Sequence, residues 1–264
     1  MRSLEIREKD GVEFLFSPLL VECGFLRHAF STRRGGVSEG RFGSLNLGVV
    51  KGEEPDRVRE NRRRFFAAAD LSPEKVAEVR QVHGVQVVDA EEVAANGGLS
   101  ADGIMTGESG VFVAVQSADC VPVLLADPVN RAVAAIHAGR RGTEAGVLES
   151  ALLRMNARYG SRAEDLIAAL GPGISGECYE VGEECIPPFR ARYPEWREIC
   201  VSVGRGKWLL DLPAAVRLQL TAAGVPEEQI GSAPNCTFSE SARFFSHRRD
   251  GAPTGRLLSA IGIV

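Results

Sequence analysis

Two apolar runs joined by a short turn constrain this chain more than any other feature of its sequence. Residues 121–127 read VPVLLAD and residues 131–138 read RAVAAIHA, with the turn-forming sequence DPVN at 127–130. Such runs predict consecutive β-strands, and the turn indicates that the two strands pair as a hairpin. Cys120 stands directly before the first run, and His137 stands near the end of the second. The hairpin could therefore bring a thiol and an imidazole together.

Cys120 and His137 lie directly opposite each other if the hairpin closes symmetrically about Pro128 and Val129. Opposed side chains on one face of an antiparallel pair have Cβ atoms roughly 4.5–5.5 Å apart, so a sulfur and a ring nitrogen can reach one metal ion. Pro122 donates no ladder hydrogen bond, and a slip of one residue would point the pair to opposite faces. The alternative is a buried, unreactive cysteine and a hydrogen-bonded histidine. We interpret the pair as two ligands of a metal site.

A third ligand has to come from another part of the chain. The sequence contains four histidines, and besides His137 these are His28, His83 and His247. His28 and His247 have basic neighbours, which disfavour a nearby cation. His83, in the segment EVRQVHGVQVV, is expected in a turn between a helix end and a strand. On charge alone we predict that His83 is the third ligand.

The rest of the chain mixes helical and β-patterns without a regular βαβ repeat. Residues 54–70 have helical spacing, and residues 143–160 predict a helix that Thr143 caps and Gly160 ends. Strands are predicted at 84–90, 111–115, 165–173 and 255–264, a helix at 212–224 and a long glycine-rich loop at 31–48. This order predicts an α+β fold with layered mixed sheets, in a single domain over residues 1–264.

Composition excludes several classes of protein. A formal net charge of -4 with 25% charged residues argues against binding of nucleic acid. The N-terminal segment is charged from residue 2, and no apolar run is long enough to cross a bilayer, so we expect a cytoplasmic protein without a membrane partner. The six cysteines are sparse and form no C-x-x-C pair, which argues against a disulfide framework or a zinc finger.

Several longer motifs occur in order over nearly the whole chain. They read HAFSTRRGGVSEGRFGSLNLG, VRQVHG, ADGIMT, SADCVPVLL, HAGRRGT, LGPGISGECYEVG, NCTF and RFFSHRRDGAPTGRLLSAIGI. In these motifs the chain resembles the YfiH-type purine nucleoside phosphorylase family, formerly labelled multicopper polyphenol oxidoreductase or laccase. The resemblance implies a mixed α/β fold similar to the catalytic domains of cytotoxic necrotising factors.

The resemblance also implies an activity. It implies a zinc ion held by His83, Cys120 and His137, phosphorolysis of purine nucleosides to base and ribose 1-phosphate, cleavage of methylthioadenosine and deamination of adenosine. Purine nucleosides and phosphate would then be the partners. One departure is visible, because Arg140 stands where the family usually has tryptophan in the H-A-G motif.

The residues fit this chemistry when they are considered on their own. Two imidazoles and a thiolate leave one zinc position open, which is typical of catalytic sites, and such a zinc can activate water for attack on adenine. Asp119 is a candidate for proton transfer, or else a residue that hydrogen-bonds the turn. For phosphate we predict Arg33 and Arg141, and for a ribose hydroxyl or base edge Asn46.

Three other readings stay open. Four histidines are too few for a multicopper cluster, although a mononuclear copper with Met105 as a weak axial ligand remains an alternative to zinc. Cys120 as nucleophile and His137 as base would give a metal-free hydrolase or deamidase. A non-enzymatic carrier or scaffold is the third reading. Among the arginines, Arg34 and Arg140 are interpreted as solvated surface residues.

Overall fold

Two six-stranded sheets pack against each other in the computed structural model, which describes residues 2–71 and 76–264. The N-terminal sheet has the order β1 (Glu5–Lys9), β2 (Val12–Phe16), β3 (Leu26–Ser31), β15 (Leu257–Ile263), β7 (Phe112–Ser117), β4 (Val76–Glu78). The hairpin sheet has the order β14 (Ile230–Ser232), β10 (Ile167–Leu170), β8 (Val121–Asp127), β9 (Ala132–Ala138), β6 (Gly103–Thr106), β5 (Val87–Asp89). Both sheets are mixed, since β4 and β7 pair in parallel, as do β5 and β6.

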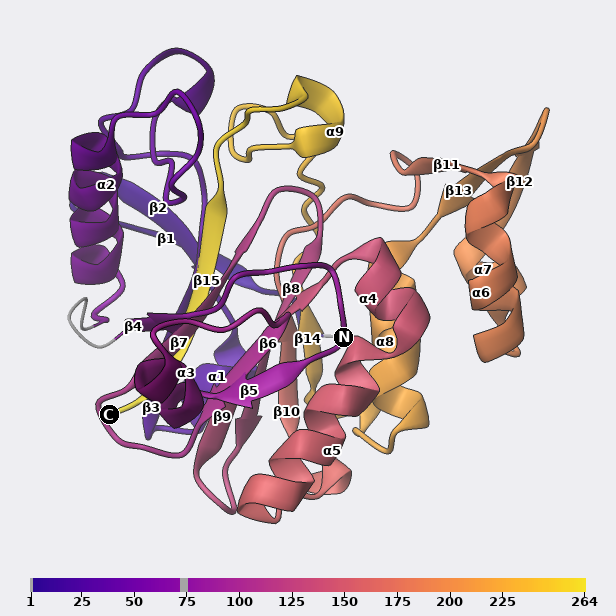
Figure 1. Ribbon diagram of the computed structural model, residues 1–264, viewed down its shortest axis with the longest axis horizontal. Helices are drawn as coiled ribbons and strands as arrows, with labels where there is room; N and C mark the ends of the chain where they lie inside the picture. The colour runs from indigo at the N-terminus through magenta and orange to yellow at the C-terminus, as the bar shows by residue number, and fades with distance from the viewer. Residues whose placement is uncertain (1, 72–75) are drawn as a thin grey trace.

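Helices cover the outer faces of the two sheets, as Figure 1 shows. Helix α2 (Pro55–Ala68) packs on the N-terminal sheet, where Phe65 joins a core with Phe14 and Leu258. Helices α5 (Val147–Tyr159) and α8 (Leu212–Ala222) pack on the hairpin sheet. A third core lies between the sheets. The result is a four-layer helix–sheet–sheet–helix arrangement, which confirms the predicted α+β fold with layered mixed sheets.

Shorter helices complete the chain. They are α1 (Pro18–Glu22), α3 (Ala90–Asn96), α4 (Arg140–Ala145), α6 (Ile186–Arg192), α7 (Trp196–Ile199) and α9 (His247–Asp250). The predicted helices at 54–70 and 212–224 and the predicted strands are found, most of them shorter by a few residues at their ends. Residues 32–48 form the expected loop, apart from one short 3-10 turn at Gly40–Phe42. Within the described residues, no helix is long and apolar enough to span a bilayer.

The predicted hairpin forms, but its register differs from the prediction. His137 pairs with Pro122, and Cys120 lies just before β8 begins, so the expected direct opposition of Cys120 and His137 is wrong by two residues. The cause is the turn: the Asp127 carboxylate accepts hydrogen bonds from the backbone N–H groups of Val129 and Asn130, each 2.9 Å long. This closes a four-residue loop instead of a turn about Pro128 and Val129.

The helix after β9 also begins earlier than predicted. Gly139, not Thr143, is its N-cap, and the Thr143 hydroxyl donates to the Gly139 carbonyl oxygen at 3.0 Å from inside α4. Gly146, with a φ of 91°, then separates α4 from α5. Gly160 ends α5 in the left-handed conformation, as predicted. Arg141 therefore lies in the first turn of α4 and not before a helix.

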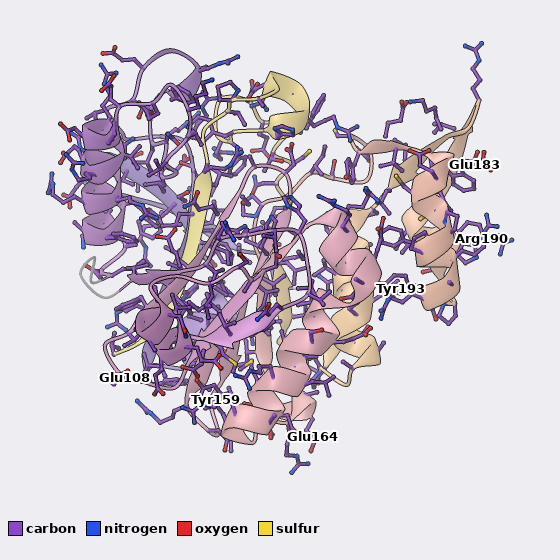
Figure 2. The ribbon with its side chains drawn as sticks, in the orientation of Figure 1. Glu108, Tyr159, Glu164, Glu183, Arg190 and Tyr193 are labelled. Carbon is purple, nitrogen blue, oxygen red and sulfur yellow. The ribbon has the colours of Figure 1, made fainter. Side chains whose placement is uncertain are left out.

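A small lobe stands at the edge of the molecule. It contains the three-stranded sheet β11 (Glu180–Gly182), β13 (Lys207–Leu210), β12 (Cys200–Gly204) together with α6 and α7 (Figure 1). Tyr193, labelled in Figure 2, joins this lobe to the body, because its hydroxyl donates to the Thr143 carbonyl oxygen at 3.3 Å and accepts a hydrogen bond from Gln219. The sequence patterns did not predict these elements.

Candidate metal centre

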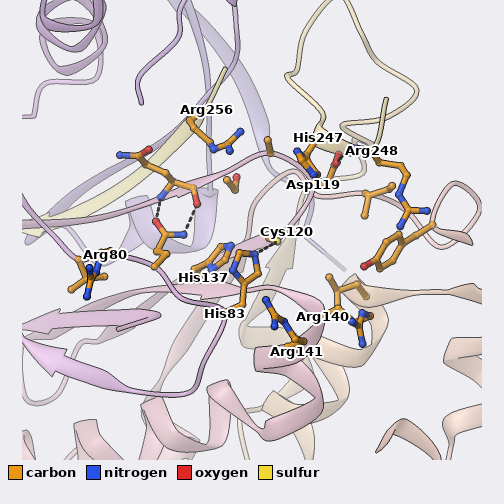
Figure 3. A pocket seen from close by; sticks show the side chains of 18 residues that line it. Arg80, His83, Asp119, Cys120, His137, Arg140, Arg141, His247, Arg248 and Arg256 are labelled. Atoms are coloured by element: carbon orange, nitrogen blue, oxygen red, sulfur yellow. Dashed lines mark hydrogen bonds between the residues drawn. The ribbon is translucent and has the colours of Figure 1, made fainter. Parts of the chain in front are cut away.

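Three side chains from distant segments meet beside the loop that joins β7 to β8. His83, Cys120 and His137 each place one donor atom within 4.8 Å of the others. The Cys120 Sγ lies 3.9 Å from the His83 Nε2, and the two imidazole rings are nearly perpendicular with centroids 4.9 Å apart. Figure 3 shows the three at the centre of a pocket. His137 is buried, Cys120 is partly exposed and His83 is exposed, so the cluster is open on one side.

Strand alternation explains why Cys120 and His137 still meet. Val133 and Ala135 of β9 face the core between the sheets, and His137 continues this alternation. On β8, Leu124 and Ala126 face the same core, and Cys120 is in phase with them. A register shift of two residues preserves the face on which a side chain lies, whereas a shift of one would have separated the pair.

A buried carboxylate orients both histidines. Asp102, fully buried, accepts a hydrogen bond from the His137 Nδ1 at 2.9 Å. It also accepts from the backbone N–H groups of Val82, His83 and Gly84, at 3.2, 2.9 and 2.6 Å. These bonds hold His83, whose φ is 61°, in its turn. With its Nδ1 bonded to Asp102, His137 offers its Nε2 to the cluster, which is the usual arrangement for a metal-bound histidine.

The backbone next to the cluster is also held in a defined conformation. Asp119, with a φ of 94°, accepts hydrogen bonds from the Thr237 hydroxyl and the Arg248 backbone N–H, both 2.6 Å long. Its carboxylate thus holds the turn before Cys120, one of the two roles considered for it. A Cβ at Gly139 would lie 2.9 Å from the His83 Cδ2 and 3.1 Å from the Cys120 Sγ. Only glycine leaves room for the cluster at this position.

The electrostatics of the cluster favour a thiolate. Burial would raise the pKa of Cys120, but the charge of His137 and hydrogen bonds from His137 and His83 outweigh it and lower that pKa to about 6. Burial would lower the pKa of His137, but the Cys120 thiolate and the Asp102 carboxylate raise it to about 9. Without a metal, Cys120 and His137 therefore form a thiolate–imidazolium pair at neutral pH.

Arginines surround the cluster in a pocket of about 580 Å³. Figure 3 places Arg256 on one side of the cluster and Arg140 and Arg141 on the other, with Arg248 beyond Asp119. The five arginines that line the pocket are Arg80, Arg140, Arg141, Arg248 and Arg256. Arg140 pairs with Glu144, whereas the other four have no carboxylate partner within the described part of the chain. The pocket therefore presents unneutralised positive charge beside the three donors.

Arg256 is the most enclosed of these four. Its Nη1 donates to the Thr254 and Gly255 carbonyl oxygens, and burial lowers the pKa of its guanidinium, which the charges of Cys120 and Asp119 partly offset. Its backbone N–H donates to the Asn46 Oδ1 at 2.8 Å. Arg256 directly precedes β15, so the residues that line the pocket extend from Val79 to the start of the C-terminal strand.

The other residues predicted for the site lie elsewhere. Arg33 donates from Nε to the Gly43 carbonyl oxygen at 2.7 Å and stacks on Phe245. Asn46 is fully buried, and its Oδ1 accepts a hydrogen bond from the backbone N–H of the pocket residue Arg256. Neither belongs to the pocket lining within the described residues, whereas Arg141 does.

Two further interpretations can be compared with the structure. Arg34 is not simply solvated, because it pairs with Glu13 at 3.4 Å. Met105 lies in the core that the hairpin sheet shares with α5, on the sheet face opposite to His137, so it is not placed as an axial ligand.

Sequence reasoning missed several residues of the pocket. Asp102 stands in the ADGIMT motif and Arg256 in the TGR segment, but nothing local indicates that they meet the cluster. Gln81 and Gln116 were also missed; Gln81 exchanges two hydrogen bonds, of 2.7 and 2.8 Å, with the Gln116 backbone and so fixes the segment before His83. The local sequence marks Asp102 as an acidic residue directly before a buried strand, which makes it a candidate for a functional site without naming its partner.

Known proteins resemble the whole chain. The family model described as "Multi-copper polyphenol oxidoreductase laccase" matches residues 27–264. A protein of Deinococcus radiodurans named purine nucleoside phosphorylase is 42% identical over 254 residues, which cover 96% of this chain and 94% of that protein. The purine nucleoside phosphorylase YfiH of Escherichia coli (strain K12) is 40% identical, covering 89% of this chain and 92% of the relative.

Solved structures agree with the fold. YlmD from Geobacillus stearothermophilus has a TM-score of 0.89 at 33% identity, covering 100% of this chain and 99% of that one. The hypothetical protein YfiH of Bacillus licheniformis has a TM-score of 0.89 at 30% identity, covering 98% and 99%. The resemblance that the sequence motifs carry is therefore confirmed.

Proposed function

The chain belongs to the family whose model is described as multi-copper polyphenol oxidoreductase laccase, and on this premise we propose that it is a zinc-dependent purine nucleoside phosphorylase. The observation that carries the proposal is a two-histidine, one-cysteine cluster, open on one side, within a pocket lined by five arginines, four of which have no carboxylate partner among the described residues. Relatives that are named purine nucleoside phosphorylase support the enzyme class.

The donor set fits zinc. Two imidazoles and a thiolate are common zinc ligands, Asp102 orients His137 from behind, and Gly139 leaves space for an ion. Zinc, when bound, supplies a Lewis acid that polarises an oxygen of the substrate. Copper remains the alternative metal, and the position of Met105 in the opposite core counts against a blue-copper arrangement.

The arginines would hold the second substrate. Phosphorolysis forms a bond from a phosphate oxygen to the ribose C1′ while the bond from C1′ to the base nitrogen breaks. Guanidinium groups bind phosphate through paired N–H donors. Arg141 and Arg256 lie on two sides of the cluster, and neither pairs with a carboxylate among the residues that the structure describes. The predicted roles of Arg33 and Asn46 stay predictions. Arg33 donates to the Gly43 and Ser241 carbonyl oxygens. The Asn46 amide donates to the Gly48 carbonyl oxygen and the Glu53 carboxylate.

Substrate range is also part of the proposal. Cleavage of methylthioadenosine and deamination of adenosine are carried over from the resemblance. A cytoplasmic location stays a prediction from the charged N-terminal segment and the short apolar runs. Tyr179 lines the pocket with its ring packed against the Arg248 guanidinium at 4.8 Å, and this pair is our candidate for contact with the purine.

Incubation of the purified protein with a panel of purine nucleosides, with and without phosphate, tests the function. We expect free base and ribose 1-phosphate only when phosphate is present, and about one zinc per chain by elemental analysis. Release of base at the same rate without phosphate would exclude phosphorolysis.

A second candidate is a metal-free hydrolase in which Cys120 is the nucleophile. The thiolate–imidazolium pair with pKa values of about 6 and 9 favours it. Chelation separates the two candidates, because a zinc enzyme loses turnover on metal removal and regains it with zinc. A metal-free enzyme would keep its turnover and become sensitive to alkylation of Cys120.

A further inference from the structure

Two cysteines outside the metal cluster share a second cavity beside the pocket. Cys178 and Cys236 line this cavity, which has a volume of about 600 Å³. The Thr237 backbone N–H donates to the Gly173 carbonyl oxygen at 3.0 Å, and the Ser175 N–H donates to the Cys236 Sγ at 3.3 Å. The loops at 171–179 and 233–240 are thus joined next to the two sulfurs. Neither cysteine has a role in the proposed reaction.

The two sulfurs differ in their chemical state. Burial would raise the pKa of Cys236, but hydrogen bonds from the hydroxyl and backbone groups of Ser175 and Ser239 lower it to about 7. Burial raises the pKa of Cys178, a hydrogen bond from Ser175 opposes this, and a hydrogen bond to Cys236 raises the pKa further. A thiol therefore faces a sulfur of which about half is thiolate at pH 7, the pairing that thiol oxidation needs.

Both cysteines are directly connected to the metal-centre pocket. Cys178 precedes Tyr179, which lines the pocket. Cys236 precedes Thr237, whose hydroxyl donates to Asp119 at 2.6 Å, and Asp119 precedes the ligand Cys120. A covalent link between the two loops would therefore restrain the segments that carry Tyr179 and support Asp119.

We propose that Cys178 and Cys236 form a reversible oxidation site, at which a hydroperoxide joins the two loops by a disulfide bond. The Cys236 thiolate attacks a peroxide oxygen, the O–O bond breaks, and hydroxide leaves and is protonated to water. The Cys178 sulfur then attacks the resulting sulfenic sulfur and loses its proton, and the S–O bond breaks to release a second water. The two thiols lose two electrons, and hydrogen peroxide gains them. A dithiol such as dithiothreitol reverses the reaction by thiol–disulfide exchange.

Peptide mapping of the full-length, zinc-loaded protein after treatment with hydrogen peroxide tests the site. We expect a peptide pair linked through Cys178 and Cys236, which dithiothreitol separates. In Cys178→Ser, the sulfenic acid on Cys236 has no partner and should be trapped by dimedone. In Cys236→Ser, Cys178 should stay reduced at the same peroxide concentration.

Cys200→Ser is the matched control, because Cys200 lies buried in the small lobe, where burial raises its pKa to about 11. This variant should form the same linked peptides as the unmodified chain. Peroxide treatment that leaves Cys178 and Cys236 as free thiols, or that links either of them to another cysteine instead, overturns the proposal.

The effect of the disulfide on the pocket is measured separately, through the KM for the nucleoside. This measurement rests on the proposed function. Oxidation should raise the KM for the nucleoside in the unmodified chain and leave it unchanged in Cys178→Ser. A disulfide that forms without any change in KM would overturn the connection but leave the phosphorylase assignment intact. Absence of phosphorolysis in the reduced protein would instead contradict the proposed function, and peptide mapping would still decide the oxidation site.

Discussion

His28 and His137 are both buried histidines, and their pKa values move in opposite directions. Burial lowers the pKa of His28 to about 3, and its Nε2 accepts a hydrogen bond from the Ser17 backbone N–H at 2.8 Å. His137 is as enclosed, but the Cys120 thiolate and the Asp102 carboxylate beside it raise its pKa to about 9. Burial alone makes a histidine neutral and structural. The charged groups around His137 are what make its surroundings suitable for chemistry.

Removal of Cys120 should have the largest effect on the charged surroundings that distinguish His137 from His28. We expect Cys120→Ala to lose its zinc and to cleave nucleosides roughly a hundredfold more slowly or worse, because several kcal/mol of metal-dependent stabilisation disappear. Elemental analysis and product assays measure both effects. Full zinc content in this variant would contradict the assignment of Cys120 as a ligand.

Asp102 provides the next largest test. Asp102→Asn keeps the shape of the side chain but removes the charge behind His137, and its amide nitrogen cannot accept the backbone hydrogen bonds around His83. We expect zinc affinity to fall by about 10- to 100-fold, as for other carboxylates behind a metal-bound histidine. Competition with a chromophoric chelator gives the affinity. Unchanged zinc binding would show that Asp102 serves only the fold.

The free energy of unfolding should depend on pH in a way that reveals the titration of His28. Its folded pKa of about 3 lies below the unfolded value, so its contribution is complete above pH ~6.5 and is lost as the pH falls towards 3. Between pH ~6.5 and ~4.5 this amounts to about 2–3 kcal/mol. Urea unfolding of His28→Gln should lack this part of the slope. An equal slope in both proteins would mean that His28 is not the titrating group.

Substitutions of the arginines should have a smaller effect on activity than those of Cys120 and Asp102. We expect Arg141→Ala to raise the KM for phosphate by roughly tenfold, the loss of one charged hydrogen-bonded contact, and to affect adenosine deamination less. Arg33→Ala should mainly lower the free energy of unfolding, because Arg33 holds the Gly43 and Ser241 carbonyl oxygens. Steady-state kinetics with varied phosphate separates the two variants. If Arg33→Ala raised the phosphate KM as much as Arg141→Ala, the sequence-based role of Arg33 would be restored.

Local pattern was sufficient for most strands and for the three cluster residues. Cys120 and His137 were selected on a register that proved wrong, yet the difference of two residues left both on one face. The basic neighbours of His28 and His247 pointed to His83, which joins the pair in the cluster. The turn at Asp127 and the start of α4 at Gly139 depend on specific hydrogen bonds that hydrophobic patterns do not encode.

Contacts between distant segments were beyond local reasoning. Asp102 meets His137 across 35 positions of sequence, and the Asn46 side chain meets the Arg256 backbone across 210. The small lobe was missed for a related reason. Its strands are three to five residues long, and β12 is largely exposed, so they carry little periodic signal.

The position of β15 links the folding of the N-terminal sheet to the formation of the pocket. This strand, the last one in the sequence, lies between β3 and β7, which make no ladder with each other. Until it inserts, the N-terminal sheet remains in two halves, and Arg256, directly before it, has no fixed place. Closure of that sheet and assembly of the arginine-lined pocket are therefore one event, so a nascent chain should gain ligand affinity and cooperative stability together.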